Sequence, residues 1–387
     1  MRRASGPGTE ADSDTDTDTD TDTDTGTGTG TGPTVLLTGA GGFIGSAVLA
    51  ALRALPGLGG IRALTRSAAP AGTVRVAGDL ADPATLRGAA DGADVLVHLA
   101  SLVGGPEDAC TAVNVHGTRA LLAEAGRAGV GRIVHLSTSA VYGTGPHRGI
   151  GVDEVAPAPV SAASRTRLTG ERAALDAGAV VLRAPLVLGA GDRWVVPCLA
   201  DLLRRVPARW DGGGALLSLV AVTDLARLVA ALALAPEPLP VPAPGVHHAG
   251  HPRPVGIGTL LAALADHGVL PPVPADDWPW DRCTAELGRV PGVFGERQFE
   301  LMARHHWYRS EDVWRLAAVD PGPGPLERLA AAAPWYRAHL AAQPPAAPAP
   351  ARPSTAPTGP VPQGFAKEMP KLRGDAAESV RMRRSGA

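Results

Sequence analysis

Between residues 34 and 185, short apolar runs alternate with longer segments that have helical periodicity. The apolar runs predict strands at residues 35–38, 61–65, 74–76, 95–99, 132–137 and 180–182. The segments between them predict helices at residues 43–55, 83–90, 109–128 and 164–177. Continuous apolar strands that alternate with helices are typical of a parallel sheet covered on both faces. We therefore predict an α/β fold with a Rossmann-type, doubly wound parallel sheet.

After residue 185 this alternation loosens, and prolines and tryptophans become frequent. The pattern still predicts helices at residues 197–206, 224–235, 257–268, 296–305 and 311–318, with strands at 216–222 and 246–249. We assign residues 34–185 to a Rossmann-type domain. Residues 186–343 are assigned to a smaller, irregular C-terminal lobe that is interleaved with its sheet and forms the substrate pocket.

The two ends of the chain differ in composition from the middle. Residues 1–33 consist largely of acidic Asp-Thr and Gly-Thr repeats, and residues 344–387 are rich in proline and alanine and are basic. Such segments bury too little apolar surface to compensate for the loss of chain entropy on folding. We predict that both are disordered tails.

Charge and composition exclude several classes of function. The net charge is −2, so no overall charge favours nucleic acid or a membrane surface. The only lysines are Lys367 and Lys371, and the three cysteines are scattered. The N-terminus lacks the apolar core of a signal peptide, and no uncharged apolar run reaches about 18 residues. We expect a cytoplasmic protein without a disulfide framework, a membrane or a nucleic-acid partner.

A glycine-rich motif, TGAGGFIG at residues 38–45, follows the first predicted strand and opens the first predicted helix. Gly39 permits a tight turn, Gly42 lets the backbone approach a pyrophosphate, and Gly45 lets the helix pack close to the strand. The strand before the motif and the helix after it are the context that dinucleotide binding requires.

The end of the second predicted strand indicates which dinucleotide is bound. An acidic residue there would bind the ribose of NAD, but no Asp or Glu occurs between Gly45 and Asp79. Arg66 lies at this strand end and is suited to pair with a 2′-phosphate. NADP is therefore favoured over NAD.

An ordered series of motifs resembles the extended short-chain dehydrogenase/reductases of the NAD-dependent epimerase/dehydratase family. The motifs are TGAGGFIG (38–45), GDL (78–80), HLA (98–100), NVHGT (114–118), STSAVYG (137–143), GE (170–171), RAP (183–185) and VTD (222–224). The resemblance spans about residues 34–320. It implies enzymes that act mostly on nucleotide sugars, and a possible homodimer through the helices at 109–128 and 164–177.

The resemblance also implies contacts to the cofactor. Asp79 and Leu80 would lie along the adenine, and Leu99 and Ala100 would pass the ribose and phosphates. Asn114 would be a buried polar residue near the active site. The full set of predicted cofactor contacts is Gly39, Gly42, Phe43, Ile44, Gly45, Arg66, Asp79, Leu80, Leu99, Ala100 and Arg167.

The catalytic residues depart from the family pattern. The family uses a Ser or Thr, which Thr138 matches, and a Tyr followed four residues later by a Lys. Residues 159–171 align with the family's PxSPYxxSKxxGE without a gap, which places Ala163 at the Tyr and Arg167 at the Lys. Ala163 cannot transfer a proton, whereas Arg167 keeps a positive charge that is able to bind ribose hydroxyls. Thr138 and Arg167 are the predicted catalytic residues.

Other groups near this position are weaker replacements for the tyrosine. His147 has the best intrinsic pKa, but its Gly/Pro-rich surroundings favour an exposed loop histidine. Tyr142 is interpreted as a packing residue or a substrate wall, and Ser161 and Ser164 as alternatives that act through a bound water. Histidines at 247, 248 and 251 form a small cluster, but no motif predicts a metal site.

Three functional hypotheses remain from the sequence. The first is an NAD(P)-dependent epimerase, dehydratase or reductase acting on a nucleotide sugar or another small hydroxyl or carbonyl substrate, with a non-standard catalytic site. The second is a catalytically weakened NADP(H)-binding sensor or partner protein. The third is an enzyme of non-redox chemistry in which the dinucleotide is structural. The absent Tyr/Lys pair separates the first from the others without deciding between them.

Overall fold

The computed structural model describes residues 31–235 and 244–342. Its centre is a seven-stranded sheet in which all neighbouring strands are parallel. In spatial order the strands are β12 (Gly245–His248), β7 (Val180–Ala184), β5 (Arg132–Thr138), β4 (Val95–His98), β1 (Thr34–Thr38), β2 (Gly60–Thr65) and β3 (Val74–Ala77). This confirms the predicted α/β fold with a doubly wound sheet. The predicted tails, apart from residues 31–33, lie outside the described residues.

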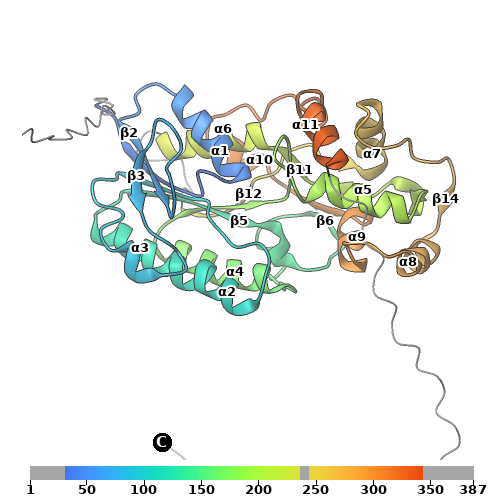
Figure 1. The fold of residues 1–387 in the computed structure, drawn as a ribbon, viewed down its shortest axis with the longest axis horizontal. Helices are drawn as coiled ribbons and strands as arrows, with labels where there is room; N and C mark the ends of the chain where they lie inside the picture. Colours follow the sequence, from blue (N-terminus) through green and yellow to red (C-terminus); the bar gives the residue numbers. More distant parts are fainter. Residues whose placement is uncertain (1–30, 236–243, 343–387) are drawn as a thin grey trace, which may run out of the picture. The chain divides into compact units, whose positions relative to one another are not determined.

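Helices cover both faces of this sheet (Figure 1). One face carries α1 (Phe43–Ala54), α6 (Val222–Leu234) and α10 (Glu311–Leu316), and α1 packs directly against α6. The other carries α2 (Glu107–Thr111), the π-helical segment η2 (Ala112–Gly117), α3 (Thr118–Arg127) and α4 (Ala162–Asp176). The inner strands β1, β4, β5 and β7 are almost completely buried between these layers, which explains their largely apolar runs, whereas the edge strand β3 is mostly exposed.

The other described elements lie mostly within residues 186–342, the segment predicted to form the C-terminal lobe. A small sheet has the order β13 (Val255–Gly256), β10 (Leu216–Leu217), β15 (His306–Tyr308) and β6 (His147–Ile150). Two strand pairs join β8 (Leu186–Leu188) to β11 (Leu219–Ala221), and β9 (Arg209–Trp210) to β14 (Asp277–Trp278). The lobe helices are α5 (Val195–Arg205), α7 (Ile257–Asp266), α8 (Trp280–Arg289), α9 (Glu296–Ala303) and α11 (Leu329–Ala341).

Several predicted elements differ in detail from the observed ones. The helix expected at residues 83–90 is a single 3-10 turn, η1 (Pro83–Leu86). The helix expected at 109–128 starts at Glu107 and is interrupted by η2. The strand expected at 216–222 is two short strands, β10 and β11. Within the described residues, no helix is both long enough and apolar enough to cross a membrane.

A buried carboxylate fixes the start of α5. Asp192 accepts hydrogen bonds from the backbone N–H groups of Trp194, Val195 and Val196, and from the hydroxyl of Tyr336 on α11. Four donors around one carboxylate replace the water that Asp192, 1% exposed, has lost. Asp192 therefore connects α5 and α11, although burial raises its pKa.

We expect Asp192→Ala to lower the free energy of unfolding by about 1–3 kcal/mol, because it leaves buried backbone donors without an acceptor. Urea denaturation measures this change. Asp176→Ala is the control, since Asp176 is exposed at the end of α4 and makes no hydrogen bond within the described residues. Equal midpoints for the two variants would contradict the role of Asp192.

Candidate active site

The glycine motif forms a tight turn between β1 and α1. Gly39 has φ +74°, and a Cβ there would lie 3.0 Å from the backbone nitrogen of Ala100. A Cβ on Gly45 would lie 1.9 Å from the carbonyl oxygen of Gly39. The first N–H groups of α1 have no partner within the helix, so they are available to an anion at this turn. The turn has the close backbone packing that a pyrophosphate cradle requires.

A cavity of about 350 Å³ lies beside this turn. Five of the predicted cofactor residues line it, namely Gly39, Arg66, Asp79, Leu80 and Ala100. Leu99 is buried in the core instead, and Gly42, Phe43, Ile44 and Gly45 belong to the turn and helix start rather than to the lining. The contacts themselves remain predictions.

Arg66 lies at the rim of this cavity. Its side chain is 77% exposed, and one guanidinium nitrogen is 3.7 Å from Asp79 Oδ2. An exposed pair at this distance holds the guanidinium only weakly. Arg66 therefore lies at the cavity rim with its guanidinium largely open to solvent.

A buried histidine joins the ends of β1 and β4. The hydroxyl of Thr38 lies 2.8 Å from His98 Nδ1 and accepts hydrogen bonds from the N–H groups of Leu99 and Ala100. His98 Nε2 lies 3.0 Å from the hydroxyl of Thr118. Burial, and then the charge of Arg167, lowers the pKa of His98 to about 4, so this ring is neutral near pH 7.

Thr138 ends β5, at the edge of the sheet where the carboxyl ends of the strands meet. Its hydroxyl oxygen accepts a hydrogen bond from the N–H of Ala140 and so caps the turn η3 (Ser139–Tyr142). The side chain is half-buried, and its O–H remains able to donate. Capping and hydrogen bonding to a ligand are therefore compatible at this residue.

The first turns of α4 face the same strand end. Ser161 and Ser164 form a reciprocal capping box, so both hydroxyls serve the helix start. Ala163 is half-buried and carries no titratable group. The sequence suggested that Ser161 and Ser164 act as acids through a bound water. In the structure, these two hydroxyls hydrogen-bond to each other.

Arg167 is a half-buried cation that forms no hydrogen bond to a carboxylate among the described residues. Its Nη2 donates to the carbonyl of Leu136, two residues before Thr138, at 3.1 Å. Its Nε is buried with no hydrogen-bond partner, and it forms no ion pair with any described residue. Burial lowers the pKa of Arg167 to about 10, so it stays charged at pH 7. Its charge in turn contributes to lowering the pKa of the buried His135.

Asn114 connects the loop after β4 to α4. Its side-chain oxygen accepts from Leu102 N–H, and its Nδ2 donates to the Leu102 carbonyl and to the Thr166 hydroxyl. This residue lies in the π-helical segment η2 and is 3% exposed. Asn114 is thus a buried polar residue, as expected. Its hydrogen bonds join the loop at Leu102 to α4.

A buried polar network that the sequence did not predict lies behind β5. Glu171 forms an ion pair with Arg183, with their closest atoms 2.5 Å apart, and accepts a hydrogen bond from the hydroxyl of Ser137. The Tyr142 hydroxyl lies 2.7 Å from both Arg183 Nη1 and His248 Nε2. Burial raises the pKa of Tyr142, so this phenol keeps its proton at neutral pH. The interpretation of Tyr142 as a packing residue or a substrate wall stays a prediction.

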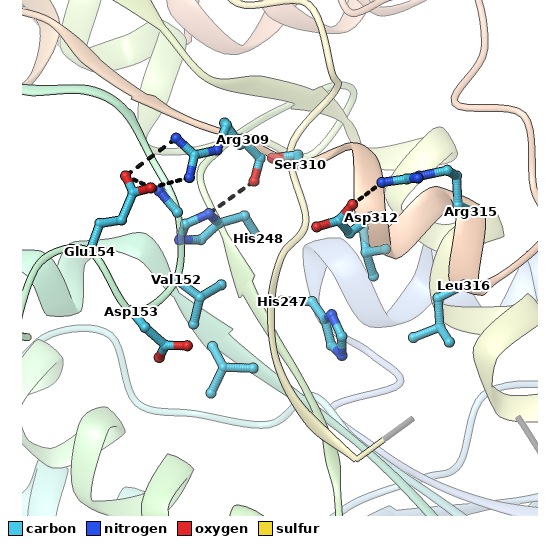
Figure 2. Close-up of a pocket in the computed structure, with 13 residues that line it drawn as sticks. Val152, Asp153, Glu154, His247, His248, Arg309, Ser310, Asp312, Arg315 and Leu316 are labelled. Carbon is cyan, nitrogen blue, oxygen red and sulfur yellow. Dashed lines mark hydrogen bonds and ion pairs between the residues drawn. The ribbon is translucent and has the colours of Figure 1, made fainter. Parts of the chain in front are cut away.

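His248 also borders a cavity of about 710 Å³ beyond β12 (Figure 2). There His248 Nδ1 lies 3.0 Å from the Arg309 carbonyl, and the charged side chains pair with one another, Arg309 with Glu154 and Arg315 with Asp312. Because both arginines that line this cavity already form ion pairs with carboxylates, they are less available to bind an anionic ligand.

The prediction that His147 is an exposed loop histidine is wrong. His147 is 5% exposed, lies on β6 and packs against the rings of Tyr142, His306 and Tyr308. The partner strand β15 lies about 160 residues away in sequence, so no local sequence pattern could predict that His147 is buried. Among the described residues, no three His, Cys, Asp or Glu side chains are grouped to hold a metal ion.

A model of the NAD dependent epimerase/dehydratase family matches residues 35–243, more than half of the chain. The chain belongs to this family. A 4-hydroxy-2-methyl-3-oxo-4-farnesyl-3,4-dihydroquinoline-1-oxide ketoreductase from Stigmatella aurantiaca is 30% identical to this family member over 313 residues. The match covers 76% of this chain and 84% of that protein.

Other comparisons agree with this assignment. A 2-alkyl-3-oxoalkanoate reductase from Stenotrophomonas maltophilia (strain K279a) is 36% identical over 196 residues, which cover 46% of this chain and only 58% of that reductase. The structure of MoeE5 in complex with UDP-glucuronic acid and NAD matches 79% of this chain and 99% of its own, with a TM-score of 0.59 and 23% identity. UDP-glucuronic acid 4-epimerase from Bacillus cereus gives the same TM-score, coverage of 79% and 99%, and 18% identity. At these identities the solved structures show the fold.

We expect Gly45→Ala to abolish nucleotide binding, because the added methyl group forces α1 away from the turn. Gly126→Ala is the control, since a Cβ at the exposed Gly126 meets nothing within 4 Å and Gly126 lies outside the cavity lining. Fluorescence titration with NADPH compares the two variants, and circular dichroism checks that both are folded. Wild-type affinity in a folded Gly45→Ala variant would contradict the cradle.

Proposed function

We propose that this protein is a nicotinamide-dinucleotide-dependent reductase of a small ketone, with NADPH favoured over NADH. The observation that carries this proposal is the half-buried guanidinium of Arg167, which forms no ion pair with a described residue, beside the strand that ends in Thr138. A ketone oxygen becomes negative during reduction, and a pre-placed positive charge in a site of low dielectric stabilises that charge.

The residues at the glycine turn fit the dinucleotide. The turn leaves no space for side chains at Gly39 and Gly45, and the adjoining cavity extends from Gly39 to Arg66 and Asp79. When bound, the reduced dinucleotide supplies the hydride equivalent that a ketone carbon accepts. The N–H groups that start α1 would hold its phosphates, and Arg66 would bind a 2′-phosphate.

The chain's own residues then act on the carbonyl oxygen. The Thr138 hydroxyl donates a hydrogen bond to it, and Arg167 stabilises the negative charge as it forms. Ala163 provides no proton, so water protonates the resulting alkoxide. Asn114 holds the Leu102 backbone and α4 in place, which fixes Arg167 relative to β5.

The names of two relatives support a ketone as the substrate. One is a reductase of 2-alkyl-3-oxoalkanoates, and the other is a ketoreductase of a 2-methyl-3-oxo compound. Both names describe a 3-oxo group beside a substituted carbon. A nucleotide sugar is the alternative substrate class, and a binding protein without turnover is the alternative function that Ala163 favours.

We expect the wild-type protein to bind NADPH more tightly than NADH, and Arg66→Ala to remove most of this difference. Arg66→Ala deletes the charge that would meet the 2′-phosphate. Arg62→Ala, on the strand that ends just before Arg66 but outside the cavity lining, leaves both affinities unchanged. Fluorescence titration measures both. Equal affinities of the wild-type protein for NADPH and NADH would contradict the proposed NADP preference. If neither dinucleotide binds, the proposed reductase function is wrong.

We expect Arg167→Ala to lower the kcat for reduction of ethyl 2-methylacetoacetate by about 10²- to 10³-fold, the usual effect of removing one group that stabilises an oxyanion. Thr138→Val should have a similar effect. Arg165→Ala is the control, because Arg165 lies on the same helix but is exposed and paired with Glu107.

Two further measurements separate the alternatives. A higher Kd for NADPH in Arg167→Ala would indicate a ribose contact, whereas an unchanged Kd with a lower kcat supports charge stabilisation at the carbonyl. Turnover of UDP-glucose but not of the ketoester would favour the nucleotide-sugar alternative. NADPH binding without turnover of either compound would favour the sensor.

A further inference from the structure

A second, smaller cavity of about 210 Å³ lies in the C-terminal lobe, lined in part by Arg148, Asp211, Arg304 and His305. Strands β6, β15 and β10 run parallel there. The residues immediately before each of these strands, or at its start, line the cavity. The fold therefore gathers side chains from three distant segments at the amino ends of parallel strands.

The nitrogen donors in this cavity lack protein partners. Arg148 is exposed and makes no hydrogen bond or ion pair in the described chain. The guanidinium of Arg304 stacks 4.0 Å from the ring centroid of Trp280, while its buried Nε has no hydrogen-bond partner. Stacking fixes the plane of this guanidinium without using any of its N–H groups.

His305 adds a third donor of defined orientation. Its Nδ1 accepts a hydrogen bond from the N–H of Leu216 at 3.1 Å. A neutral imidazole that accepts at Nδ1 carries its proton at Nε2. His305 is therefore a donor at Nε2 without requiring protonation.

We propose that this cavity binds the phosphate group of a ligand, held by Arg148, Arg304 and His305. The two arginines and the single carboxylate, Asp211, leave a net positive charge, and Asp211 forms no ion pair with either arginine. Guanidinium groups match the geometry of phosphate oxygens and bind them through pairs of N–H donors. In the cavity beyond β12, by contrast, the arginines are already paired with carboxylates.

This site is separate from the proposed reductase site and does not depend on it. None of the residues that line the cavity belongs to the glycine turn, to the end of β5 or to α4. A ligand with a phosphate group would thus contact the lobe at a place of its own.

The test is calorimetric titration of the full-length protein with inorganic phosphate at constant ionic strength. We expect Arg148→Gln and Arg304→Gln each to raise the phosphate Kd about tenfold, as for loss of one hydrogen bond to a charged group. Arg282→Gln is the matched control, because Arg282 also stacks 4.0 Å from a tryptophan ring, that of Trp278, but lies outside the cavity. It should bind phosphate as the wild-type protein does.

Other outcomes would overturn the proposal. Phosphate binding that survives both substitutions would place the anion elsewhere, for example at the start of α1. Acetate binding as tightly as phosphate would replace the phosphate assignment with a carboxylate. Because Arg148 is exposed, Arg148→Gln keeps the test valid even if loss of the Arg304 stacking disturbs the lobe.

Discussion

The hydroxyl of Thr38 is the contact on which the arrangement of this site depends. It lies against the ring of His98 at the end of β4 and accepts hydrogen bonds from the N–H groups of the two residues that follow β4, at the point where the glycine turn begins. Because Thr38, His98 and Leu99 are buried, these groups need partners within the protein, which fixes the relative position of the ends of β1 and β4. The cradle of α1 and the loop that Asn114 clamps both follow from that position.

Two arginines near β5 show how differently one side chain can be used. Arg183 is buried and forms an ion pair with Glu171, so it stabilises the packing of β7 against α4. Arg167 lies one turn earlier on α4 than Glu171, is half-buried, and donates its hydrogen bond to a backbone carbonyl. A partly buried charge without an ion pair costs stability, and proteins retain such a charge mainly where it serves a ligand or a reaction.

Local sequence patterns predicted the sheet well, because most of its strands are apolar runs and its longer crossovers contain helices. They also located the glycine turn and the strand-end Thr138, since these residues are neighbours in the chain. The patterns missed what distant segments build together. The network of Tyr142, Arg183 and His248 and the burial of His147 both depend on partners far away in sequence. The direction of the Arg167 side chain likewise follows from packing that no periodicity reveals.

The last strand of the central sheet, β12, comes from residues 245–248, long after the lobe has begun. Between β7 and β12 the chain leaves the sheet, builds α5 and part of the lobe, and returns through α6. A fragment that stopped near residue 185 would expose the edge of β7 and the apolar face of α1 that α6 covers. During synthesis, the nucleotide-binding half must therefore remain incomplete until most of the chain has left the ribosome, so the two halves mature together rather than in turn.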